Sequence, residues 1–206
     1  MSKRKLPEVN AGSMADIAFL LLIFFLVTTT IEKDKGIARF LPLITTDDPL
    51  PVKEKNILPI LINAEGDFFI RDRIIPIEEI SEIALDFIDN GGAPAGSDFY
   101  CSYCQGNHDP KSSDAPQKAV IAIEANRKSP YNSYILLQDE LAKAYNTLRN
   151  RESQRLFGYD FTKVHQEYQE GRYKGNTKKV KAELDQIKEL YPLLITDAET
   201  KKQNTL

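Results

Sequence analysis

The residue with the clearest chemical potential is Asp16, because it is the one charged residue in a long apolar stretch. Residues 11–31 hold no other charged side chain, and Ile17–Val27 is unbroken apolar sequence. A charged carboxylate costs about 2.5–3.5 kcal/mol at the centre of a bilayer, so desolvation favours its protonated form. A group that changes its protonation inside a membrane can carry protons, which makes Asp16 a candidate proton carrier. The alternative is a boundary residue whose carboxylate stays in the headgroup layer.

The surroundings of Asp16 predict a partner. A helix through this stretch places small and apolar residues on the same face, namely Gly12, Ser13, Leu20, Ile23 and Val27. The stretch contains no Lys, Arg or His, so a compensating group must come from another chain or from water. The small residues beside Asp16 favour close approach of a neighbouring helix. We therefore predict that this face packs against another helix.

The apolar stretch itself predicts a transmembrane helix over residues 11–31. At a rise of about 1.5 Å per residue it would reach about 31 Å, which matches the hydrocarbon core of a bilayer. A cleaved signal peptide is the alternative, since Lys3, Arg4 and Lys5 form a basic start, but no small-x-small cleavage site follows Val27. Three basic residues stand on each side of the stretch, so their number leaves the orientation open.

A second group of reactive side chains is Cys101 and Cys104, in a stretch rich in Gly, Ser, Asp and Pro. A disulfide between them is our first interpretation, followed by free thiols. A metal site ranks third, because only His108 and Asp109 lie near enough to add ligands. The sequence holds no Gly-rich phosphate loop, zinc motif or nucleophile arrangement. We therefore predict no enzyme activity, no metal and no bound cofactor.

The elements that position these residues follow from composition and hydrophobic pattern. The chain has 206 residues with 27 basic and 30 acidic side chains, and this balance gives no reason to expect a nucleic-acid partner. Residues 32–56 are rich in charge and turn formers and predict a linker, in which Pro49 and Pro51 disfavour helix. Residues 57–206 predict a small α+β domain.

Within that domain the pattern predicts strands and helices in mixed order. The expected strands are 57–63, 67–71, 119–124 and 191–196, and the expected helices are 77–88, 131–150 and 177–190. Pro76 begins the first helix, and Pro192 favours an edge position for the last strand. Residues 91–117 and 151–190 are insertions, and we expect the second to be a solvated helical excursion.

The segment around Asp16 resembles the N-terminal segment of the ExbD/TolR family of biopolymer transport proteins. That family has a short basic tail, an Asn six residues before an Asp, and then a long aliphatic and aromatic run. Asn10 and Asp16 stand at those two positions. The α+β domain also resembles the family's periplasmic domain, except that Ala125-Asn126 stands where the family has an Ala-Asp pair.

The resemblance implies a single-pass protein of the bacterial inner membrane, with residues 1–10 in the cytoplasm and the C-terminal domain in the periplasm. It also implies a polytopic ExbB/TolQ-like subunit that forms a ring, expected to be a pentamer, around a pair of copies of this chain. Proton flow past Asp16 would then energise a TonB- or TolA-like protein for transport across the outer membrane or envelope maintenance. Protons are the expected coupling ion, with sodium as the alternative. The alternative function is a membrane-tethered periplasmic binding or scaffolding module without proton coupling.

Overall fold

The computed structural model describes residues 11–28 and 52–198 of the chain. It divides into two compact units, Met1–Asp47 and Asp48–Leu206. The first unit contains helix α1, Ala11–Thr28. Asn10, the predicted tail 1–10 and most of the predicted linker 32–56 lie outside the described residues.

Of the transmembrane helix predicted over residues 11–31, the structure describes residues 11–28, as helix α1. Over residues 11–28 and 52–198, no helix is both long enough and apolar enough to cross a membrane. Helix α1 has 18 residues, and its rise of about 1.5 Å per residue gives about 27 Å. Residues 29–31, which complete the predicted span, lie outside the described residues.

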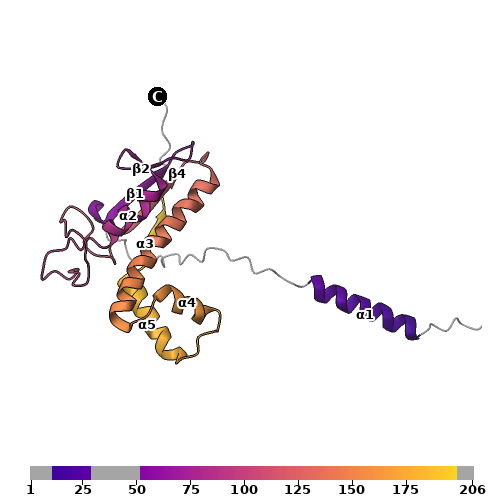
Figure 1. Ribbon diagram of the computed structural model, residues 1–206. Helices are drawn as coiled ribbons and strands as arrows, with labels where there is room; N and C mark the ends of the chain where they lie inside the picture. Colours follow the sequence, from indigo (N-terminus) through magenta and orange to yellow (C-terminus); the bar gives the residue numbers. More distant parts are fainter. Residues whose placement is uncertain (1–10, 29–51, 199–206) are drawn as a thin grey trace, which may run out of the picture. The chain divides into compact units, whose positions relative to one another are not determined.

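The second unit is built on a five-stranded sheet with the order β3-β2-β1-β4-β5. Three of these strands, β1, β2 and β4, are labelled in Figure 1. The strands are β1 Ile57–Ile62, β2 Phe68–Ile70, β3 Arg73–Ile75, β4 Val120–Ala125 and β5 Ile195–Asp197, and a short 3-10 turn, Glu54–Asn56, leads into β1. The first three strands form an antiparallel meander, and β4 and β5 run parallel to β1 and to each other. The parallel pair β1–β4 requires a crossover connection, and that connection contains helix α2, Ile77–Ile88.

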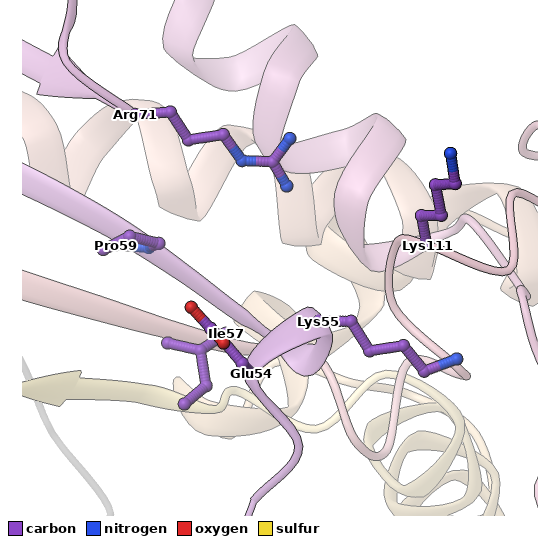
Figure 2. Close-up of a pocket in the computed structure, with 6 residues that line it drawn as sticks. All are labelled: Glu54, Lys55, Ile57, Pro59, Arg71 and Lys111. Atoms are coloured by element: carbon purple, nitrogen blue, oxygen red, sulfur yellow. The ribbon is translucent and has the colours of Figure 1, made fainter.

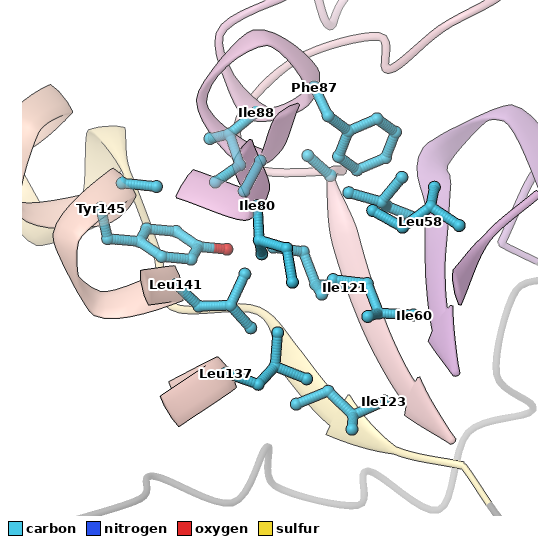
Figure 3. Close-up of a cluster of buried hydrophobic side chains, with 14 of the residues drawn as sticks. Leu58, Ile60, Ile80, Phe87, Ile88, Ile121, Ile123, Leu137, Leu141 and Tyr145 are labelled. Carbon is cyan, nitrogen blue, oxygen red and sulfur yellow. The ribbon is translucent and has the colours of Figure 1, made fainter. Parts of the chain in front are cut away.

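One face of the sheet is covered by α2 and by the long helix α3, Tyr131–Phe157. Alternate residues of each central strand point to this face, so that Leu58, Ile60 and Ile62 are buried in β1 while Pro59 is exposed. Figure 3 shows the strand side chains meeting those of the two helices. The core residues from the helices are Ile80, Ala84, Phe87, Ile88, Leu137, Leu141, Ala144, Tyr145 and Leu148.

A second, smaller core lies at the C-terminal end of α3. It is formed with α4, Phe161–Gln169, and α5, Thr177–Leu190, and its buried residues are Phe161, Val164, Val180, Leu184 and Ile187. Gly158 ends α3 at a φ of 77°, a left-handed conformation that glycine adopts without strain. The insertion over residues 151–190 is helical, as predicted, but the expectation that it is solvated is wrong, because it buries its own apolar stripe.

The predicted α+β architecture is confirmed in its general form, as a small mixed domain with a sheet. The helices α2 and α5 have the predicted bounds, whereas α3 extends seven residues beyond the predicted end at residue 150. Strand β3 and helix α4 were not predicted. The last strand begins at Ile195 rather than at Tyr191, because the Tyr191 side chain is fully buried in polar contacts at the end of α5.

Candidate functional site

Helix α1 carries Asp16 together with most of the residues predicted to share its face. Gly12 and Leu20 lie one turn before and after Asp16, and Ile23 lies about two turns after it, so helical geometry places all four on one side. Asp16 is exposed within this unit, as are Leu20 and Ile23 at 54% and 40%. Ser13 and Val27 fall within the helix bounds. The proton-carrying and partner-facing roles of these residues stay predictions.

The loop between α2 and β4 contains a disulfide between Cys101 and Cys104, whose Cα atoms are 5.6 Å apart. Both cysteines are buried, and the backbone N–H of Cys104 donates to Cys101 Sγ at 3.1 Å. Gly91, at a φ of 63°, packs so closely that a Cβ there would lie 2.8 Å from Cys104 Cβ. The disulfide therefore packs against the backbone at Gly91, just after the end of α2. In the part of the chain that the structure describes, no group of three or more His, Cys, Asp and Glu residues is placed to hold a metal ion.

An extensive set of buried polar contacts converges on Asp89, at the C-terminal end of α2. Its carboxylate is almost fully buried and accepts two hydrogen bonds from Arg151 of α3, from Nη1 at 2.6 Å and from Nη2 at 2.8 Å. It also accepts from the Tyr191 hydroxyl at 2.7 Å and from the backbone N–H of Gln105 at 3.1 Å. We call these four residues the Asp89 junction. The junction joins α2, α3, the disulfide loop and the segment after α5.

The C-terminal end of α5 is fixed by further side chains around the junction. Arg149 donates to the Tyr191 carbonyl from Nε at 3.0 Å and from Nη2 at 2.7 Å, while the Tyr103 hydroxyl donates to the Leu190 carbonyl at 3.0 Å. Gln117 Nε2 donates to the same Leu190 carbonyl at 3.1 Å. Carbonyl groups at a helix end have no partner within the helix, so these contacts satisfy groups that would otherwise need water.

Charge and burial at the junction explain the shifted ionisation of its members. Burial raises the pKa of Tyr191, and the hydrogen bond to Asp89 raises it further. The hydrogen bond to Asp89 raises the pKa of the Arg151 guanidinium against the opposing effect of burial. Glu152, which has no exposed surface, is paired with Arg151 at 3.3 Å and with Arg155 at 2.7 Å. The junction is therefore a buried, paired charge network with a structural role.

A hollow of about 510 Å³ opens beside the start of β1 (Figure 2). It is lined by three cations and one carboxylate over an apolar floor, namely Lys55, Arg71, Lys111, Glu54, Ile57 and Pro59. Lys55 is already paired with the buried carboxylate of Asp114 at 2.5 Å. The hollow was not identified from the sequence, because its lining comes from three segments that are far apart along the chain. With charges of both signs it selects no single class of ligand.

Two comparisons with known proteins bear on these sites. The family described as biopolymer transport protein ExbD/TolR matches residues 2–150, which is more than half of the chain. The chain is also 30% identical over 79 residues to biopolymer transport protein exbD2 of Vibrio cholerae serotype O1. That similarity covers 38% of this chain and 57% of the relative, so the chain spans little more than half the length of that protein. Helices α4 and α5 lie beyond the range of the family match.

Proposed function

The chain belongs to the ExbD/TolR family of biopolymer transport proteins, and on that basis we propose that it is the proton-coupled subunit of an inner-membrane motor complex. The observation that carries the proposal is the position of Asp16, which lies in the only long apolar stretch of the sequence and within the range of the family match. We propose that residues 11–31 anchor the chain in the inner membrane. The N-terminus would then be cytoplasmic and the second unit periplasmic, where a disulfide between Cys101 and Cys104 is stable.

In this proposal Asp16 takes up a proton from one side of the membrane and releases it to the other. The free energy needed to bury its carboxyl group in an apolar environment is small when the group is neutral and large when it is charged. Each change of protonation therefore changes which surroundings are favourable for the helix. One elementary charge that crosses a potential of 100 mV releases about 2.3 kcal/mol. Several protons would therefore supply enough free energy to move one helix relative to its neighbours.

The proposal requires partners, because residues 11–28 contain no cation that could compensate Asp16. A polytopic ExbB/TolQ-like subunit, arranged as a pentameric ring around two copies of this chain, would provide the polar groups and the proton path. Gly12 and Ser13 would let a neighbouring helix approach closely. The periplasmic domain would pass the resulting motion to a TonB- or TolA-like protein. In this role the chain is a transport component rather than an enzyme and needs no cofactor besides protons.

The experiment that tests the proposal compares Asp16→Asn with wild type and with Asp16→Glu. Asparagine keeps the size of the side chain but cannot carry a proton, whereas glutamate keeps the carboxyl group. We expect Asp16→Asn to assemble normally, as judged by the mass of the intact complex in mild detergent, and to lose energised transport. Asp16→Glu should retain part of the transport rate.

Two results would contradict this proposal. Full transport by Asp16→Asn would remove the proton-carrying role and leave a membrane-tethered binding or scaffolding module as the better function. A bare monomer or homodimer, stable in several detergents, would remove the ring partner. The tethered module also predicts that an unrelated apolar helix in place of residues 11–31 preserves function, whereas the motor predicts that this exchange abolishes it.

A further inference from the structure

The disulfide loop touches two separate parts of the domain at once. On one side, Cys104 packs against Gly91, just beyond the end of α2. On the other side, Tyr103 donates to the Leu190 carbonyl at 3.0 Å, and its ring meets the ring of Tyr191 edge-on at 5.6 Å between centroids. Tyr103 lies within the ring that the disulfide closes, so the bond restricts where its side chain can be.

We propose that the Cys101–Cys104 disulfide is a substrate for thiol–disulfide exchange with a dithiol, and that its reduction releases Tyr103 from the end of α5. In the oxidised protein the loop holds Tyr103 as a latch on the C-terminal end of α5, against Leu190 and Tyr191. In the reduced protein the latch opens and the end of α5 becomes more mobile. This inference does not depend on the proposed function, because it concerns the domain alone.

The geometry favours one direction of attack. Both cysteines are buried, and what distinguishes them is the backbone N–H of Cys104, which donates to Cys101 Sγ at 3.1 Å and makes Cys101 the better leaving group. A thiolate of the dithiol would attack Cys104 Sγ, forming a mixed disulfide while the original sulfur–sulfur bond breaks. Cys101 would leave as a thiolate stabilised by that N–H and then take a proton from water.

The second thiol of the reductant completes the exchange. As a thiolate it attacks the reductant's own sulfur in the mixed disulfide, so that Cys104 leaves as a thiolate and is protonated. The dithiol becomes an internal disulfide, and two electrons and two protons pass to the cysteine pair. Reduction of the protein disulfide and oxidation of the dithiol therefore balance without a further reactant.

Release of Tyr103 should loosen the end of α5 without unfolding it. The Tyr191 carbonyl keeps both bonds from Arg149, which do not involve Tyr103. The Leu190 carbonyl still has Gln117 as a donor, although the same Gln117 amide also donates to the Tyr103 hydroxyl. The amide of Tyr191, which donates to the Ile187 carbonyl, reports directly on this last turn. The expected change is therefore local to the last turn of α5.

The test is hydrogen exchange of the full chain in detergent micelles, before and after treatment with dithiothreitol. Alkylation of both thiols, counted by mass, verifies that the native protein has been reduced. We expect amides of residues 187–191 to exchange about tenfold faster after reduction, while those of β1 keep their rates. Tyr103→Phe should give the same acceleration with the disulfide intact.

Two further variants separate the latch from a general loosening of the loop. Tyr100→Phe alters an exposed tyrosine of the same loop and should leave residues 187–191 unchanged. The double variant Cys101→Ser with Cys104→Ser should show fast exchange with no response to dithiothreitol. The inference is overturned if the native disulfide resists the dithiol until the protein is denatured. It is equally overturned if reduction leaves exchange at residues 187–191 as it was.

Discussion

Replacement of Arg151 by methionine is the most informative perturbation of the domain, because Arg151 supplies two of the four hydrogen bonds to the Asp89 carboxylate. Both bonds are short, at 2.6 and 2.8 Å, and the Asp89 side chain is only 3% exposed. Methionine fills a similar volume but leaves the carboxylate with the Tyr191 hydroxyl and one backbone N–H. The variant therefore leaves a buried charge without its counter-charge.

The size of the effect follows from the burial of the two partners. Removal of one member of a buried ion pair costs about 3–5 kcal/mol. The Arg151 side chain is 26% exposed, so water can enter when it is removed, and we expect the lower end, about 3 kcal/mol. Tyr191→Phe removes a single hydrogen bond to a charged group and should cost about 1.5–3 kcal/mol.

Urea unfolding of the full chain in detergent, followed by the near-ultraviolet signal of its tyrosines, measures both variants. With an m value of about 2 kcal/mol per molar, a loss of about 3 kcal/mol lowers the midpoint by about 1.5 M. Lys181→Met, which breaks an exposed pair with Asp185, is the matched control and should shift the free energy of unfolding by less than about 0.5 kcal/mol. If Arg151→Met were no more destabilising than Lys181→Met, the Asp89 junction would not be a stabilising network.

Two pH effects follow from other charged groups. Burial lowers the pKa of His165, helped by the nearby charges of Lys188 and Arg149, so the unfolded chain binds a proton more readily. The free energy of unfolding should therefore fall as the pH drops through the range just below the ordinary histidine value of about 6.5, and His165→Gln should flatten that slope. Burial alone would raise the pKa of Asp114, but hydrogen bonds from Lys55 and Asn56 outweigh it and hold the pKa below its ordinary value. This stabilisation is lost as the pH falls through the acidic range, so Lys55→Met should move acid unfolding to a higher pH, and an unchanged acid midpoint would contradict the pairing.

The elements that the sequence predicted well are those in which local pattern and tertiary packing agree. Helix α5 follows its stripe of Val180, Leu184 and Ile187, which the smaller core buries. Strand β1 was predicted despite Pro59, whose missing N–H usually disfavours a central strand. The proline is tolerated because β2 pairs only with Leu61 and Ile62, so no hydrogen bond to β2 requires an N–H at Pro59.

The elements that were missed depend on contacts that no local pattern reports. Strand β3 has three residues, and a turn at Arg71 and Asp72 with φ values of 49° and 62° separates it from β2. Neither residue is a glycine or an asparagine, so the usual signal for a two-residue hairpin turn is absent. Helix α4 has nine residues and mostly polar sequence, and its two buried residues are Phe161 and Val164. Such a short helix is stable through packing rather than through intrinsic propensity.

The Asp89 junction was invisible in the sequence for a related reason. Asp89 lies 62 residues from Arg151 and 102 residues from Tyr191 along the chain. A single sequence gives each of these residues an ordinary surface interpretation, since most Asp and Arg side chains are exposed. Only the fold shows that four separate segments bring their polar groups to one buried point.

Within the proposed function, the long helix α3 and the two insertions have a mechanical role, because α3 connects the sheet core to the smaller helical core. Its 27 residues reach about 40 Å, with the first part in the sheet core and the last part in the smaller helical core. A helix clamped only in the sheet core would bend at its free end when a partner pulls on it. The Asp89 junction and the hydrogen bonds of Arg149 instead connect the segment after α5 to α2 and α3. The smaller core is therefore attached to the rest of the domain both through α3 and through this segment. On the proposed function the domain passes motion to a partner and needs this stiffness, so a variant such as Arg151→Met should reduce transport before it reduces assembly with the proposed ring.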